Sequence, residues 1–126
     1  MMRTGRREFF GENWSVNILA NATTAIWDYT VPSRCDLELL EFGNYMGTAG
    51  AWGTNYFFAT KNGVAIQLAG GFPYIFDQVG YAAQRQRISQ AVRASGGDRL
   101  IIYGVEATGA AVDMGVSVGY DLIYEE

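Results

Sequence analysis

The sequence predicts an all-β domain, a sandwich or barrel of about eight or nine antiparallel strands. Its clearest stretch, 112–125 (VDMGVSVGYDLIYE), alternates large apolar residues with glycine, serine and carboxylates. That period of two indicates a strand with one buried face. Turn residues separate the predicted strands, and no long helical pattern occurs. The 16 glycines and an aromatic content of 14% are typical of the same class.

Residues 1–12 are basic and then aromatic, with no apolar period, and we expect them to form an extended N-terminal arm. The single β domain is then 13–126. Its predicted strands begin at Trp14 and continue over 25–32, 35–42, 54–68 (a hairpin), 72–78, 99–107 and 112–125. The segment 85–94 fits either a helix or a strand.

Local signals add detail to these strands. Pro32 lacks a backbone donor and predicts the end of the second strand. The apolar parity shifts at Leu39–Leu40, which predicts a β-bulge. Asn62-Gly63 supplies the positive φ angles of a tight hairpin turn. The stretch 112–125 is longer than a usual strand, so we expect a bend or bulge at Gly115 or Gly119.

Composition limits the classes of function that we expect of the chain. The net charge is −4 and the pI about 4.7, which makes nucleic acid an unfavourable partner. The chain has no histidine, the commonest general base and metal ligand, so we expect no enzyme activity, metal or cofactor. Its one cysteine, Cys35, is predicted to be a buried core thiol. No secretory signal and no apolar stretch of membrane-spanning length is visible, so we expect no membrane partner.

Three patterns in the sequence have more than one interpretation. The carboxylates Asp36, Glu38 and Glu41 match either a glycoside hydrolase pair or the solvated outer face of a strand, and we favour the strand face. Arginines concentrate between residues 85 and 99 and suit an acidic partner or carboxylates of the same protein, the latter preferred. Aromatic residues in glycine-rich loops stack on sugars, pack in a protein interface or, for about half of them, belong to the core; these are Tyr45, Trp52, Phe72, Tyr74 and Tyr81.

Two longer stretches carry a resemblance. Residues 29–42 (YTVPSRCDLELLEF) and 95–126 (SGGDRLIIYGVEATGAAVDMGVSVGYDLIYEE) resemble strands and turns of the jelly-roll domains of tailed-phage virion proteins, particularly capsid decoration (cement) proteins. The resemblance covers about residues 25–126. It implies a jelly-roll-like β-sandwich and a homotrimer on the capsid surface, assembled in the host cytoplasm and bound to the major capsid protein, without catalysis. It transfers no individual site residue.

The first functional hypothesis is therefore a structural virion component that stabilises the shell through protein–protein contacts. The alternative is a tail or fibre appendage domain that binds host glycan through Trp52 and its neighbours. The expected contact residues lie in the arm and in the later loops and strands. The arm supplies Arg3, Arg6, Arg7, Phe9 and Phe10, and the rest are Trp52, Arg85, Arg87, Gly115 and Gly119.

Arginine forks suit carboxylate partners, and the two arm phenylalanines are apolar anchors. Gly115 and Gly119 lack side chains, so we expect them to let a second subunit or another backbone approach the strand closely.

Overall fold

A computed structural model describes residues 5–47, 52–68, 73–80 and 85–125 of the 126-residue chain. These residues form nine β-strands and no helix: β1 (Arg7–Ile18), β2 (Thr23–Thr30), β3 (Cys35–Met46), β4 (Tyr56–Lys61), β5 (Val64–Ile66), β6 (Tyr74–Ile75), β7 (Gln86–Ser95), β8 (Arg99–Val105) and β9 (Val112–Tyr124). Consequently no helix in the described ranges has the length and apolar character needed to cross a membrane.

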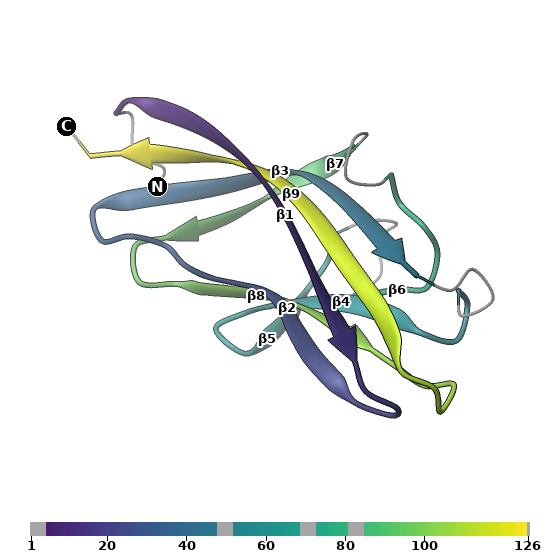
Figure 1. Cartoon of the computed structure of the whole chain (residues 1–126). Helices are drawn as coiled ribbons and strands as arrows, with labels where there is room; N and C mark the ends of the chain where they lie inside the picture. The colour runs from purple at the N-terminus through teal and green to yellow at the C-terminus, as the bar shows by residue number, and fades with distance from the viewer. Residues whose placement is uncertain (1–4, 48–51, 69–72, 81–84, 126) are drawn as a thin grey trace.

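The strands form two antiparallel sheets packed face to face, seen as the upper and lower layers of Figure 1. Sheet A has the order β1-β9-β3-β7, and sheet B has the order β2-β8-β4-β5, with β6 also paired to β4. The pairs are nested along the sequence: β1 with β9, β2 with β8, β3 with β7, and β4 with β5 and β6. A long hairpin wrapped into two layers has this order, which is the jelly-roll arrangement. The predicted jelly-roll-like sandwich is therefore confirmed.

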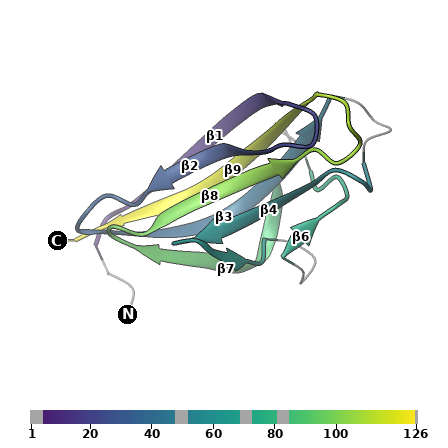
Figure 2. The same ribbon diagram turned by 90° about the horizontal axis from the view of Figure 1, so that it is seen from below.

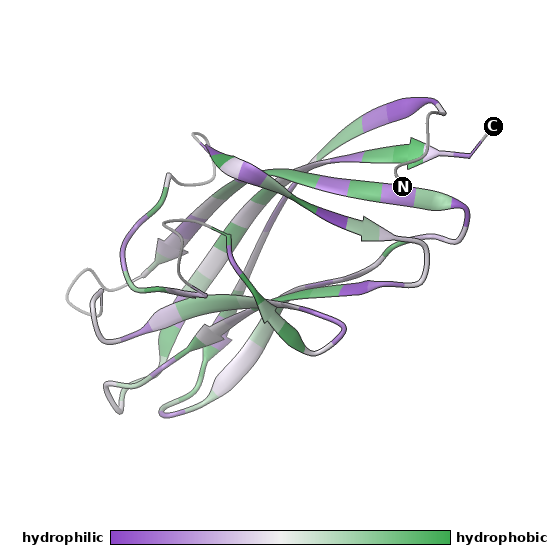
Figure 3. Ribbon diagram, turned by 180° about the vertical axis from the view of Figure 1, so that it is seen from behind, coloured by the Kyte–Doolittle hydropathy of each residue, from purple (hydrophilic) through white to green (hydrophobic). Residues whose placement is uncertain are grey.

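The core lies between the sheets and consists of the inward-facing parity of each strand. Figure 3 shows the alternation of hydrophobic and hydrophilic residues along the strands, and the view from below in Figure 2 shows β8 and β4 lying across β9 and β3. The predicted core thiol of Cys35 is buried. The largest fully buried apolar side chains are Ile18, Leu37, Leu39, Phe42, Phe57, Leu68, Leu100, Ile102, Met114 and Ile123.

Several local predictions are confirmed. β2 ends at Thr30, two residues before Pro32. Asn62 and Gly63 have φ angles of 53° and 82°, and they connect β4 to β5. The pairing register shifts between Leu39 and Glu41, as the change in apolar parity predicts. The ambiguous segment is a strand, β7, because it pairs with β3 along most of its length.

Two predictions are wrong. Residues 7–12 belong to β1 and not to a separate arm, because every residue from Arg7 to Ile18 has a partner on β9. The ring of Phe10 also stacks on the ring of Tyr120 at 5.6 Å between centroids. The second error concerns the long strand. β9 pairs with β1 without interruption, so it has no bulge of its own at Gly115 or Gly119; the register shift lies opposite Gly119, at Leu40 of the neighbouring strand β3.

Two buried residues at the end of β8, Gly104 and Glu106, make close contacts with other parts of the fold. Gly104 of β8 faces the core, where a Cβ atom would lie 2.9 Å from Ile26 Cδ1 and 3.1 Å from Met114 Sδ. Glu106, only 1% exposed, accepts hydrogen bonds from the backbone N–H groups of Asn21, Thr108 and Gly109. Its carboxylate thereby holds the turn before β2 against the loop before β9.

We expect Gly104→Ala to lower the free energy of unfolding by about 1–3 kcal/mol, the usual cost of overpacking a core. Three well-packed side chains must shift to admit one methyl group, because Ile18 Cδ1 also lies within contact of the added Cβ. Urea unfolding monitored by circular dichroism measures the change. A variant as stable as the parent protein would contradict this account of the core.

Glu106 predicts a specific pH dependence. Hydrogen bonds from the Thr108 hydroxyl and from the three backbone amides lower the pKa of Glu106 to about 2. A lowered folded-state pKa stabilises the fold above the unfolded pKa, near 4.5, and this contribution disappears as the pH falls towards 2. Glu106→Gln should therefore melt below the parent at pH 7, and the gap should narrow between pH 4.5 and pH 2. A gap that stays constant over that range would refute the linkage.

Candidate functional site

The outer face of sheet A carries a network of ion pairs across its four strands. Arg7 of β1 contacts Glu38 of β3 at 2.6 Å and Asp121 of β9 at 3.2 Å. Arg93 of β7 reaches the other oxygen of Glu38 at 3.4 Å. β9 lies between β1 and β3, so Arg7 spans it with its side chain. These contacts link all four strands of the sheet through side chains as well as through backbone hydrogen bonds.

The expected solvated strand face is only partly correct. Glu38 points to the outer face, but its residue is 8% exposed, and Asp36 is 2% exposed. The hydrogen bond from Arg7 is the main cause that lowers the pKa of Glu38, and it raises the pKa of the Arg7 guanidinium. A general acid in glycoside hydrolysis needs the opposite change, a raised carboxyl pKa. The geometry therefore supports a structural ion pair at Glu38.

The side chain of Arg85 lies across the middle of the outer face of sheet A. Its guanidinium donates to Glu41 at 3.2 Å and to the Ser117 hydroxyl at 3.0 Å, and that hydroxyl donates to Asn13 Oδ1 at 2.6 Å. Its Nη2 atom lies 2.8 Å from the position of a Cβ on Gly11. Of the clustered arginines, Arg85 and Arg93 therefore pair with carboxylates of the same chain, and so does Arg99, which binds Asp28 on sheet B.

Gly119 has a role inside the chain. A Cβ atom there would lie 2.9 Å from Phe9 Cζ and 2.5 Å from Glu41 Oε1. Two side chains of the same sheet therefore already fill the space above Gly119, where we expected a second subunit or another backbone to approach. At Gly115 the first neighbour of an added Cβ is the backbone oxygen of Trp14, at 3.1 Å. Both glycines allow neighbouring strands of sheet A to approach β9.

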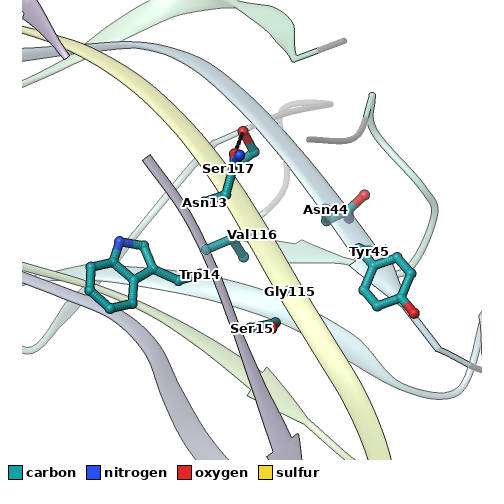
Figure 4. A pocket seen from close by; sticks show the side chains of 8 residues that line it. All are labelled: Asn13, Trp14, Ser15, Asn44, Tyr45, Gly115, Val116 and Ser117. Atoms are coloured by element: carbon teal, nitrogen blue, oxygen red, sulfur yellow. Dashed lines mark hydrogen bonds between the residues drawn. The ribbon is translucent and has the colours of Figure 1, made fainter. Parts of the chain in front are cut away.

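Beside Gly115 lies a pocket of about 230 Å³ on the outer face of sheet A (Figure 4). The side chains of Asn13 and Ser117 meet at one end, and the ring of Tyr45 lies on the opposite side of β9 from β1. The Trp14 ring points away from β9. The pocket is hydroxyl- and amide-lined with one half-exposed aromatic wall. Among the described residues, no group of three or more Cys, Asp or Glu side chains is placed to hold a metal ion.

The outer face of sheet B is chemically different, because it carries five clustered aromatic rings. The rings of Tyr56 and Phe76 lie 4.9 Å apart, and that of Tyr56 meets the Tyr74 ring edge-on at 5.5 Å. The rings of Phe58 and Tyr103 stack at 4.8 Å. Tyr74 and Phe76 are 49% and 41% exposed. We call these five residues, Tyr56, Phe58, Tyr74, Phe76 and Tyr103, the aromatic face.

Pairing between distant strands assembles the aromatic face. In β4, Phe57 and Ala59 point into the core, so Tyr56 and Phe58 point out. Phe58 pairs with Tyr103 of β8 on one side and with Tyr74 of β6 on the other. The alternate aromatics at 56 and 58 and at 74 and 76 are a sequence signal for this surface. Of the five, sequence reasoning selects Tyr74 alone, because the pairing of β6 with β4 is not a local feature.

The structure brings only some of the predicted contact residues together. Arg7, Phe9, Arg85, Gly115 and Gly119 share the outer face of sheet A, and Arg87 lies exposed on β7 of the same sheet. Phe10 points inward, and Arg6 lies over the ring of Tyr124 at 4.6 Å. Trp52 is half-buried against the core, 6.0 Å from the ring of Phe57, and is not a free stacking platform. Arg3, Phe72 and Tyr81 lie outside the described residues.

Comparisons with known proteins give little similarity. No protein-family description matches the chain, and no curated protein matches it. Among solved structures, a chain from the structure of infectious bursal disease virus Gt strain is 12% identical, and the alignment covers 95% of this chain and 41% of that chain with a TM-score of 0.26. The chain thus spans less than half the length of that viral chain, and a similarity at this TM-score carries no argument about fold or function.

Glu38→Gln should destabilise the fold by about 1–2 kcal/mol, because it removes the shared partner of two arginines from a site only 10% exposed. The loss is small because Arg7 and Arg93 are themselves more than half exposed, so solvent screens both ion pairs. Thermal unfolding of the parent and the variant at low and high salt measures this loss of stability.

The matched control is Arg34→Gln, which breaks an ion pair with Glu125 whose arginine is 81% exposed. It should cost less than about 0.5 kcal/mol. Equal effects of the two substitutions would contradict a special role for Glu38.

Proposed function

We propose that this protein is a structural component of a virion, a capsid decoration protein that binds and stabilises the shell through protein–protein contacts. The observation that carries the proposal is the aromatic face of sheet B. Monomeric proteins rarely leave a contiguous group of large apolar side chains in water, and such a patch marks an interaction surface. Tyrosine and phenylalanine anchors on a rigid sheet are well suited to protein interfaces.

The rest of the molecule supports this assignment. The two outer faces differ: a network of ion pairs between strands covers sheet A, and a cluster of partly exposed aromatic rings lies on sheet B. The nested jelly-roll pairing agrees with the fold implied by the resemblance to decoration proteins. A strand-based surface is also preorganised, so binding immobilises few side chains beyond Tyr74 and Phe76.

A second function, the recognition of host glycan by a tail or fibre domain, has one favourable observation. The pocket beside Gly115 combines the half-exposed ring of Tyr45 with the polar side chains of Asn13, Ser15 and Ser117. Sugars bind to this combination through stacking and hydrogen bonds. Trp52, the aromatic residue on which the sequence hypothesis relies, packs against the core and does not line this pocket.

The test of the decoration function is co-sedimentation with empty shells assembled from the major capsid protein encoded in the same genome. Tyr74→Ser combined with Phe76→Ser should weaken binding tenfold or more, about 1.4 kcal/mol, because both rings are among the most exposed of the aromatic face. Val64→Ser is the matched control, since it removes a 69% exposed apolar side chain from β5, outside the cluster.

Equal shell binding by the two variants would reject the aromatic face as the contact surface. Wild-type protein that does not sediment with shells but binds a defined oligosaccharide on a glycan array would replace the decoration function with the glycan function. Both variants should keep the parental melting temperature, because none of the three side chains belongs to the core.

A further inference from the structure

Strand β1 is the one long, regular edge among the described strands. It contributes 12 residues, each paired with β9 in an unbroken register. The other sheet edges are interrupted or short: β2 has a register shift near Ile26, β7 has one opposite Leu40, and β5 and β6 have three and two residues. Such interruptions protect an edge from pairing with another chain, and β1 lacks them.

The free side of β1 presents a continuous row of backbone groups. The Tyr124 amide donates to the Arg6 carbonyl at 2.8 Å, which shows that even-numbered residues at this edge turn their backbone groups towards β9. The odd-numbered residues from Arg7 to Asn17 therefore turn theirs away from the sheet. The strand contains no lysine or proline, which are common edge protectors.

The edge also carries a negative charge, Glu12, that has no cationic partner among the described residues. Glu12 accepts hydrogen bonds from the Tyr120 hydroxyl and from Trp14 Nε1, both uncharged. No ion pair of the described residues includes Glu12. It lines a cleft of about 260 Å³ between β1 and β2, together with the rings of Trp14, Trp27 and Tyr29. Aromatic rings beside a carboxylate favour a cationic group.

We propose that the β1 edges of two copies of this chain pair antiparallel about a two-fold axis, with Phe9 opposite the second copy's Phe9. Directly opposite residues lie on the same face of a sheet, so the axis passes through a single residue position of β1. With Phe9 on the axis, Arg6 faces the second copy's Glu12, and the same ion pair recurs by symmetry. Each arginine then supplies the cation that the cleft at Glu12 lacks.

Charge excludes two of the neighbouring registers. An axis at Phe10 places Glu8 opposite Glu12, and an axis at Glu12 places Glu12 opposite itself. An axis at Gly11 or Asn13 forms no ion pair. The Phe9 axis also brings together two rings that are each 50% exposed in the single chain.

The dimer would contain one continuous eight-stranded sheet. Its two-fold symmetry differs from the trimer that the family resemblance implies, so the oligomeric state separates the two. The pairing is independent of the proposed shell binding, because the aromatic face lies on the other sheet and stays open.

Sedimentation equilibrium of the full chain tests the proposal. We expect a reversible dimer at micromolar concentration. Arg6→Glu should raise the dimer dissociation constant tenfold or more, because it turns two attractive pairs into two repulsive ones. Arg87→Glu is the control, with the same charge change at an exposed position on the opposite edge of sheet A. A monomeric or trimeric wild type, or equal effects of the two substitutions, would overturn the proposal.

Cysteine cross-linking tests the register. Phe9→Cys places two thiols opposite each other, with Cα atoms about 5.5 Å apart, within reach of a disulfide. Asn13→Cys does so only with the axis at Asn13. Oxidation should link the first variant into dimers and leave the second unlinked, and Cys35 is buried in both. Cross-linking of the Asn13 variant alone, or of neither, would reject the Phe9 register.

Discussion

Sheet A depends on the double pairing of β9. This strand has β1 on one side and β3 on the other, and β7 attaches only through β3. One parity of β9 fills the core, with Met114 and Val118 completely buried, and the other parity forms the floor of the outer face. Side chains from both neighbouring strands lie beside each outward-facing residue of β9, so each of these positions must leave room for both. The glycines on its outer parity meet that constraint, because Phe9 from β1 and Glu41 from β3 both cross above Gly119.

The same constraint explains why the outer faces differ. On sheet A, the small residues of β9 leave room for long charged side chains: Glu41 lies over Gly119, and Arg85 reaches Ser117. On sheet B, the central strands β8 and β4 carry large rings on their outer parity, and no neighbouring charged side chain covers Tyr103 or Phe58 in the contacts described above. Charged side chains therefore cover much of the outer face of sheet A, whereas Tyr74 and Phe76 stay exposed on that of sheet B.

Local pattern was enough to predict β9, the bulge near Leu40 and the turn at Asn62-Gly63, because each depends on periodicity or on the φ preference of one or two residues. The start of β1 was not predictable in this way. Residues Arg7–Glu12 are exposed or half-exposed on both faces, so they show no alternation, and only the pairing with β9 makes them a strand. Local pattern does not predict the aromatic face for a related reason, since its rings come from β4, β8 and the segment of β6 and Phe76, which lie apart in the sequence.

The nested pairing has a consequence for how the chain folds. β9 is made after every other strand, yet it is the strand that joins β1 to β3. Until β9 is synthesised, β1 has no partner strand in sheet A, and β3 lacks one of its two neighbouring strands. Closing β1 onto β9 brings together residues more than 90 positions apart, and contacts this distant in sequence slow folding. The nascent chain therefore exposes unpaired strand edges for most of its synthesis, a state that favours aggregation and chaperone binding.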